Sequence, residues 1–263
     1  MLRIVVVLAG LLSLPSLADF NCEVDLQQGL LVNDTQIRVL HHGLTLYQIN
    51  HDQQLIVQGQ WIELNPEQSQ LLQELSSGIR YSVPKMILLA TEGVDLAIAT
   101  IEHVYLGLVG EEHASYKRLQ SALERAKDKV RMKFIHAGDQ FFIGPRSLEN
   151  VDELVDSALE EEIEHAINTS IGGILSAIGG LATDGDVSFE KRMENLSQKL
   201  ETMGAEIERQ VGPQAQTLRK KAVWFCEKIK RLDIIEEKLK QQVPALQPYD
   251  VIVTGGTYKH EKH

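Results

Sequence analysis

The residues of this chain best placed for covalent chemistry are its two cysteines, Cys22 and Cys226, which lie close to opposite ends of the sequence. No Cys-x-x-Cys motif occurs. An even number of cysteines in an oxidising compartment most simply forms a disulfide, and two unpaired buried thiols are the alternative. We therefore predict a bond between Cys22 and Cys226. On the chain-entropy model, closing so long a loop stabilises the fold by on the order of 5 kcal/mol.

The compartment is predicted from the first residues of the chain. Arg3 is a short positive region, residues 4–14 are apolar, and Ser16-Leu17-Ala18 supplies small residues at the two positions that signal peptidase reads. We predict that residues 1–18 are a cleavable signal peptide and that the mature chain begins at Asp19. The protein is then expected to be secreted to the periplasm.

One pair of residues has the spacing of metal ligands. Glu162 and His165 lie at positions i and i+3, so on a helix they would share one face, as in di-iron carboxylate bundles. Such a site needs a second copy of the pair, and none of His103, His113 or His136 has a glutamate three residues before it. We therefore interpret Glu162 and His165 as part of a solvated acidic face, and we predict neither a metal site nor a cofactor.

Two further motifs match catalytic or metal-binding patterns only in part. Asp184–Ser188 has the acidic alternation of a calcium loop, but Phe189 replaces the glycine at its sixth position and Asn195 the glutamate at its twelfth. Ser82 and Lys85 match the Ser-x-x-Lys pattern of acyl-serine enzymes, without the other motifs of those enzymes. We interpret the first as a helix-capping loop and the second as a coincidence, and we predict no catalytic residue.

A run of small residues is the least ordinary feature of the sequence. On a helix, Ala166, Gly173, Ser176 and Gly180 would form a stripe along one face. Each glycine destabilises a helix by about 1 kcal/mol relative to alanine, so the stripe is expected to have a compensating use. We predict that it packs closely against a second helix; a segment that touches a membrane and a hinge are the alternatives.

The elements that must position these residues begin with strands. Residues 19–64 contain short runs of β-like residues separated by turn signals such as His42-Gly43 and Gln58-Gly59, which predicts a small antiparallel β-meander. The expected strands are 23–26, 36–40, 44–49, 54–57 and 60–64. Residues 141–145 are interpreted as a short strand or a buried connection. A sheet of this size needs a helix against its apolar face to be stable.

Residues 65–250 are predicted to form a helical domain. Asn65-Pro66-Glu67-Gln68 supplies an N-cap, a proline at the first helical position and a capping-box glutamine, so a helix is expected to start there. Val83-Pro84 is expected to break or kink this helix. Residues 86–109 then predict a central core helix, which charged residues interrupt too often for a membrane span.

The later helices are predicted to be amphipathic. Residues 113–136 carry apolar side chains at alternating steps of three and four, which is a coiled-coil-like seam. A helix capped by Ser147 follows, and then a helical region over 188–243 that Gly212-Pro213 interrupts, as a kink or as a turn between antiparallel helices. Residues 251–263 are predicted to be a disordered tail. These patterns predict an α+β fold, mainly α, with the small N-terminal β-meander packed on long amphipathic helices in a bundle or coiled-coil-like arrangement.

The charge balance excludes some partners. The chain carries 37 acidic and 26 basic side chains and a formal net charge of −11. Nucleic acid and an anionic membrane surface would repel such a chain, so neither is expected as a general partner. No transmembrane span is predicted in the mature chain.

The layout of the chain resembles the YggN-like family of periplasmic proteins, whose function is unknown. The resemblance is carried by Cys22 just past the cleavage site, the small β segment, the Val83-Pro84 dipeptide, the small-residue run over 166–173, and Cys226 in a C-terminal helix. It implies a periplasmic protein without an established activity, and it supplies no catalytic residues.

We therefore expect a non-enzymatic periplasmic interaction protein, with a scaffold or chaperone-like role, whose amphipathic helices contact another protein or a second copy of the chain. The alternative is a small-molecule or lipid-binding protein, or an unrecognised hydrolase, with a pocket between the sheet and the helices. An apolar, enclosed pocket with convergent His, Glu or Ser side chains would favour the alternative. A filled core with long exposed helical grooves would favour the interaction protein.

Overall fold

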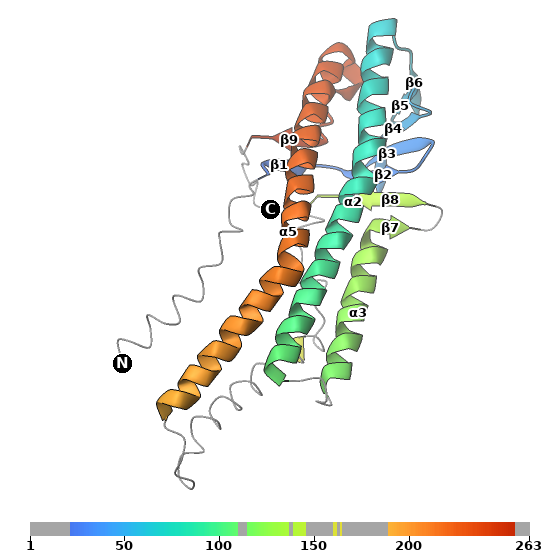
Figure 1. Cartoon of the computed structure of the whole chain (residues 1–263). Coiled ribbons are helices and arrows are strands. Elements are labelled where there is room, and N and C mark those ends of the chain that lie inside the picture. Colours follow the sequence, from blue (N-terminus) through green and yellow to red (C-terminus); the bar gives the residue numbers. More distant parts are fainter. Residues whose placement is uncertain are drawn as a thin grey trace, which may run out of the picture.

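The computed structural model of the chain describes residues 22–109, 115–136, 139–145, 160, 161, 164 and 189–255. In these residues, long helices extend away from a sheet of antiparallel strands that lies beside one end of them (Figure 1). The helices are α2 (Pro66–Val109), α3 (Ser115–Phe134) and α5 (Phe189–Gln242). The predicted α+β class with mainly helical content is confirmed.

The larger sheet in the described part of the chain has seven strands in the order β6-β5-β4-β3-β2-β8-β7, and every neighbouring pair is antiparallel. The strands are β2 (Gly29–Val32), β3 (Gln36–His41), β4 (Leu44–Asn50), β5 (Gln54–Val57), β6 (Gln60–Ile62), β7 (Ile135–His136) and β8 (Gln140–Ile143). The β3–β4 and β5–β6 turns lie at His42-Gly43 and Gln58-Gly59, where φ is positive, between 47° and 81°. Two successive positive φ angles match the twist of a tight hairpin, so these predicted turns are confirmed.

The centre of the sheet departs from the predicted meander. β2 is not among the predicted strands, yet it lies between β3 and β8. Three of its four residues are buried, so it lacks the polar alternation that marks a strand with one exposed face. The segment expected as a short strand or a buried connection supplies β8, whose Ile143 pairs with Leu30. The sheet therefore joins strands from two distant parts of the sequence.

The first predicted strand lies outside the meander. β1 (Val24–Leu26) pairs with β9 (Ile252–Thr254) in a separate two-stranded sheet. The prediction of a disordered tail over 251–263 is therefore wrong for its first residues, and Ile252 is only 1% exposed. The physical reason is that strands from opposite ends of the chain pair with each other, a contact that no local pattern shows. Residues 256–263 lie outside the described part of the chain.

Helix α2 starts where the sequence predicts and continues where it predicts an interruption. The Asn65 Oδ1 accepts a hydrogen bond from the backbone N–H of Gln68, and the Gln68 Oε1 accepts one from the backbone N–H of Asn65, both at 2.9 Å. This is a reciprocal capping box. The helix then runs through Pro84 without a break. Val83 and Ile87, on either side of the proline, are 2% and 1% exposed, and their packing holds the helix together against the lost hydrogen bond.

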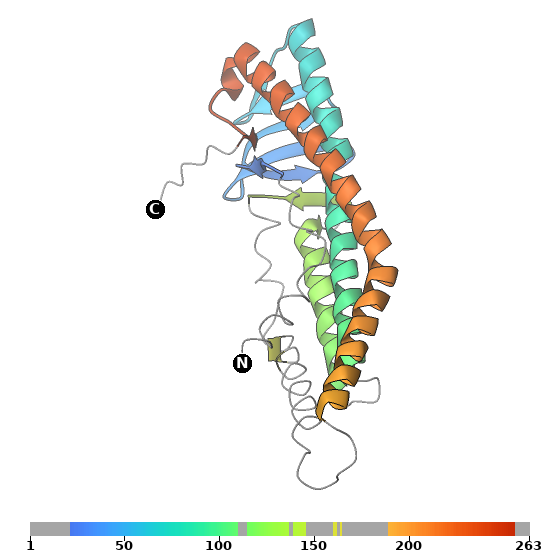
Figure 2. The same ribbon diagram turned by 60° about the vertical axis from the view of Figure 1, so that its left-hand side comes forward.

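Helix α5 also runs through its proline. The expected interruption at Gly212-Pro213 was either a kink or a turn, and the turn is wrong, because one helix extends from Phe189 to Gln242. Figure 2 shows it as a single curved helix alongside α2. It ends as predicted near Val243, and a short 3₁₀ helix, η2 (Pro244–Leu246), follows. None of the helices in the described ranges contains an apolar stretch long enough to cross a membrane.

The described helices and strands enclose two cores. We call the larger one the sheet-end core; it lies between the sheet, α2 and α5 and includes Ile49 and Leu72, both 0% exposed. We call the smaller one the far-end core; it joins α2 to α3 and consists of Tyr105, Leu119, Ala122 and Leu123, with partly buried neighbours. The predicted seam of α3 therefore faces α2.

Candidate functional site

An aromatic and basic surface spans the helices α2 and α5. We call it the aromatic–lysine surface and define it as Tyr81 and Lys85 of α2 with Trp224 and Lys228 of α5. The Tyr81 and Trp224 rings meet across the helix pair, with centroids 6.1 Å apart and planes inclined at 63°. The Lys85 Nζ lies 3.5 Å from the centroid of Tyr81, and the Lys228 Nζ lies 5.2 Å from the ring of Trp224. Both ammonium groups are therefore in cation–π range of a ring.

The local sequence explains why this surface faces solvent. Ile79 and Val83 of α2 belong to the sheet-end core, whereas Tyr81 and Lys85, four residues apart, share a different face of the helix. Tyr81 is 47% exposed and Trp224 is 44% exposed. Large rings that stay half-exposed beside positive charges are typical of binding surfaces, because they supply apolar contact area and a polar edge together.

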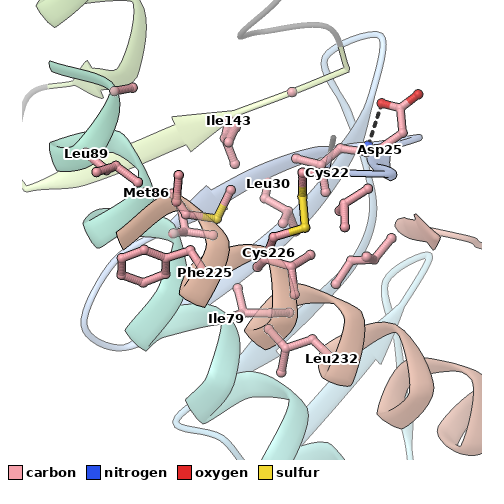
Figure 3. Close-up of a pocket in the computed structure, with 18 residues that line it drawn as sticks. Cys22, Asp25, Leu30, Ile79, Met86, Leu89, Ile143, Phe225, Cys226 and Leu232 are labelled. Atoms are coloured by element: carbon pink, nitrogen blue, oxygen red, sulfur yellow. Dashed lines mark hydrogen bonds between the residues drawn. A yellow bond between two sulfur atoms is a disulfide. The ribbon is translucent and has the colours of Figure 1, made fainter. Parts of the chain in front are cut away.

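A cavity of about 310 Å³ lies on the sheet side of the same two helices. Its wall is formed by residues of α2, α5, β1, β2, β8 and β9 together with Cys22 and Gly144, and Figure 3 labels ten of the lining residues. The wall is mostly apolar and includes Leu30, Ile79, Met86, Ile143, Phe225 and Leu232. Among the described residues that line it, Asp25 is the only one with a charged side chain, and none is His, Glu or Ser. The position is the one expected for a ligand pocket, and the described part of the wall contains none of the His, Glu or Ser side chains that would favour a hydrolase.

The predicted disulfide forms part of the cavity wall. Cys22 and Cys226 are bonded, with Cα atoms 5.8 Å apart, so the pairing expected from the sequence is confirmed. The bond ties Cys22, which precedes β1, to the C-terminal half of α5. Because Phe225 and Ile229 of α5 also line the cavity, the bond fixes one side of the space relative to the other.

A buried carboxylate holds the C-terminal strand against α5. Glu236 is 3% exposed, and its two carboxylate oxygens accept hydrogen bonds from the backbone N–H groups of Val251 and Ile252, each at 2.9 Å. Burial raises the pKa of Glu236 to about 7, although both hydrogen bonds act in the opposite direction. Burial, followed by the negative charge of Glu236, also raises the pKa of Tyr47.

Sequence reasoning missed Glu236, although a signal for it exists. The glutamate occupies a core position of the helix seam. It belongs to a series spaced at steps of three and four, which is Ile229, Leu232, Glu236, Leu239 and Val243. A charged residue at such a position is buried and needs hydrogen-bond partners. Both carboxylate oxygens are engaged by backbone, so the arrangement positions a strand and leaves no free oxygen aimed at a ligand.

Comparison with known proteins gives a family and no activity. The sequence model of a family described as "Protein of unknown function (DUF2884)" matches residues 22–252. The chain belongs to this family. The matched range begins at Cys22 and ends in β9, so it includes the disulfide, the sheet and the contacts of Glu236. The expected membership of a family without known function is confirmed. The YggN-like name of that family is not confirmed, because the matching model is described only as DUF2884. No curated protein and no solved structure matches the chain.

The structure of this family member describes only some of the residues singled out in its sequence. Three of the features singled out in the sequence lie outside the described residues: the pair Glu162 and His165, the stripe of Ala166, Gly173, Ser176 and Gly180, and the loop Asp184–Ser188. Ser82 is 2% exposed, whereas Lys85 is exposed and lies over the Tyr81 ring. In the part of the chain that is described, no group of three or more His, Cys, Asp and Glu side chains could hold a metal ion.

Proposed function

We propose that the protein is exported to the periplasm, has no enzymatic activity, and binds another protein through its aromatic–lysine surface. The observation that carries the proposal is the pair of half-exposed rings, Tyr81 and Trp224, each with a lysine ammonium group in cation–π range. In this proposal the long helices act as a bundle-like scaffold that presents the surface. The disulfide supports export, because such bonds form and persist in oxidising compartments.

The chemistry of the surface favours an acidic polypeptide that carries an apolar anchor. The neighbouring Lys221 and Lys230 are paired with Glu92 and Glu227 at 2.7 Å and 3.1 Å, whereas Lys85 lies over an aromatic ring. A partner carboxylate can therefore approach Lys85 and Lys228 while an apolar side chain packs on the rings. A symmetric contact between two copies would instead place these lysines near the same lysines of the second copy, and like charges across an interface oppose association.

The proposal is tested by site-specific photo-crosslinking in cells. A photoreactive residue replaces Trp224 in one strain and Trp61 in another; Trp61 lies in β6, is 75% exposed and serves as the matched control. We expect adducts of one discrete mass from position 224 and none of that mass from position 61. Lys85→Glu with Lys228→Glu should remove the adduct, because the double substitution reverses the charge of the surface.

Two outcomes would contradict the proposal. Adducts of the same mass from both tryptophan positions would show non-specific capture, and the absence of any adduct from position 224 would show that the surface has no protein partner. Export is tested separately by the mass of the protein from the periplasmic fraction. A mass that begins at Asp19 supports it, and a protein that retains residues 1–18 in the cytoplasm contradicts it.

A further inference from the structure

We propose that the cavity beside the disulfide binds a single hydrocarbon chain whose polar end is neutral or cationic. Its volume of about 310 Å³ is the first reason. An engineered apolar cavity of about 150 Å³ already binds benzene, and native ligand pockets begin at about 300 Å³. The space is therefore large enough for a slender apolar ligand such as one hydrocarbon chain.

The chemistry of the wall is the second reason. A water molecule in such a space needs several polar partners, and the described wall supplies mainly aliphatic and aromatic surface. Among the described residues of the wall, the one with a charged side chain is Asp25, whose Oδ1 accepts a hydrogen bond from the backbone N–H of Leu26 at 2.7 Å. A ligand carboxylate placed beside Asp25 would meet a like charge, whereas a hydroxyl or an amine would not. The charge of Asp25 therefore favours a ligand whose polar end is neutral or cationic.

The rigidity of the wall is the third reason. Cys226 in α5 is bonded to Cys22, Leu30 in β2 pairs with Ile143 in β8, and Leu232 of α5 lies directly against Gly78 of α2. These contacts fix the positions of the elements around the cavity relative to one another, so the backbone cannot readily shift to close the space. A space kept open in this way is a preformed site.

The proposed ligand site is independent of the proposed protein-binding surface. The cavity lies between the helices and the sheet, where Ile79 and Val83 of α2 contribute to its wall. Tyr81 and Trp224 are absent from that wall and are half-exposed. A ligand in the cavity would therefore leave the aromatic–lysine surface uncovered, and either proposal can fail without the other.

The test uses the full mature chain and the neutral fluorophore N-phenyl-1-naphthylamine, whose emission rises in an apolar site. We expect saturable binding and displacement by dodecanol and by dodecylamine, all below their micellar concentrations. Dodecanoate should displace the probe about tenfold less effectively because of its repulsion by Asp25. In the Asp25→Asn variant, this difference between dodecanoate and dodecanol should disappear.

Cavity-filling variants connect the binding to this site. Ala90 of α2 lines the cavity, so Ala90→Leu should weaken probe binding by about tenfold or more. Ala97, exposed on the same helix, is the matched control, and Ala97→Leu should bind as the unsubstituted protein does. If Ala90→Leu fails to fold by circular dichroism, Ala222→Leu fills the space from α5.

The proposal is wrong if the unsubstituted protein does not bind the probe saturably. It is also wrong if Ala90→Leu and Ala222→Leu bind the probe as well as Ala97→Leu does, since the probe would then lie on the exposed helix faces. Equal displacement by dodecanoate and dodecanol would overturn the part of the proposal that concerns the polar end.

Discussion

The two ends of the long helix pair are stabilised in different ways. At the sheet end, α2 and α5 pack on strands from three distant parts of the chain, and a disulfide and a buried glutamate add fixed links. At the far end, the core consists of Tyr105, Leu119, Ala122 and Leu123, all from α2 and α3. Among the described residues, long-range contacts are thus concentrated at the end that holds the cavity, while the far end is held by the packing of helices.

Close helix contacts occur at both ends, but against different side chains. Gly78 of α2 lies against Leu232, which is 5% exposed in the sheet-end core, and Gly107 lies against Met203. Because the earlier glycine of α2 meets the later residue of α5, and the later glycine meets the earlier residue, the two helices run in opposite directions. A leucine confined by a core cannot move away from an added methyl group as readily as an unbranched, partly buried methionine can. The same type of contact is therefore rigid at one end and adaptable at the other.

Loss of the disulfide should have the largest effect and should be confined to the sheet end. We expect Cys22→Ser with Cys226→Ser to lower the free energy of unfolding by about 3–5 kcal/mol, since the bond closes a loop with a sequence separation of 204 residues. Denaturant unfolding measures the total. Hydrogen exchange should accelerate in β1 and β9 before it does in α3. Equal acceleration in all three elements would show that the two ends unfold as one unit.

Truncation of one core residue at each end compares the two cores directly. Ile49 and Leu119 are both 0% exposed. Ile49→Ala should destabilise the protein by about 4 kcal/mol and Leu119→Ala by about 2 kcal/mol, because a small core between two helices can collapse around the lost atoms more fully than a core enclosed by a sheet. Thermal and denaturant unfolding check the order. A larger loss from Leu119→Ala would reverse the comparison.

The two ends should respond to pH with opposite signs. Glu236, at the sheet end, has a folded-state pKa of about 7 against an ordinary value of 4.5, because it is buried. The folded protein therefore binds more protons between these values, and the free energy of unfolding should fall by on the order of 3 kcal/mol as pH rises from about 4.5 to about 7. In the Glu236→Gln variant, this slope should be absent. An unchanged slope would assign the titration to another group.

Glu206, in the part of α5 nearer the far end, supplies the contrasting case. Hydrogen bonds from Arg209 and Gln210 lower its pKa to about 2. Its contribution is present above about 4.5 and is lost as pH falls toward 2. We expect backbone hydrogen exchange in this part of α5 to accelerate as pH falls in the unsubstituted protein. The same change in pH should cause no such acceleration in the Glu206→Gln variant.

The glycine contacts should give the smallest effects. Alanine in place of glycine favours a helix by about 1 kcal/mol. At Gly78 this gain should be outweighed by overpacking against Leu232, for a net loss of about 1 kcal/mol. At Gly107, Met203 can move, so Gly107→Ala should leave stability unchanged or raise it by up to about 1 kcal/mol. Equal melting temperatures for the two variants would remove this difference between the ends.

The parts of the fold that were predicted correctly depend on neighbouring residues. The start of α2 follows from the reciprocal contacts of Asn65 and Gln68, three positions apart, and the hairpins follow from turn residues that adopt positive φ. The seam of α3 was predicted because its buried Leu119 and Leu123 recur at helical spacing. In each case the energy that selects the structure comes from within a few residues.

The parts that were missed depend on tertiary contacts. Pro84 and Pro213 each remove a helix hydrogen bond, at a cost of about 3 kcal/mol by local rules, yet both lie inside continuous helices. Around Pro84, burial of its neighbours in the sheet-end core outweighs that cost. Two contacts join segments between which the sequence pattern indicates no contact. They are the pairing of β1 with β9 and the hydrogen bond from the backbone N–H of Ile252 to Glu236. For the candidate site, the disulfide was predicted, and a pocket between the sheet and the helices was named as part of the alternative function. The aromatic–lysine surface was missed, because the rings of Tyr81 and Trp224 meet only after the helices pack.

The position of the disulfide has a consequence for how the chain matures. Cys22 is made 204 residues before Cys226, and at about 5–20 residues per second this separation corresponds to roughly 10–40 s of synthesis. During that time the thiol of Cys22 has no partner, β1 lacks β9, and the wall of the cavity is missing α5. The most strongly linked region of the molecule is therefore the last to be completed, and a chain stopped before its final helix would leave that region open.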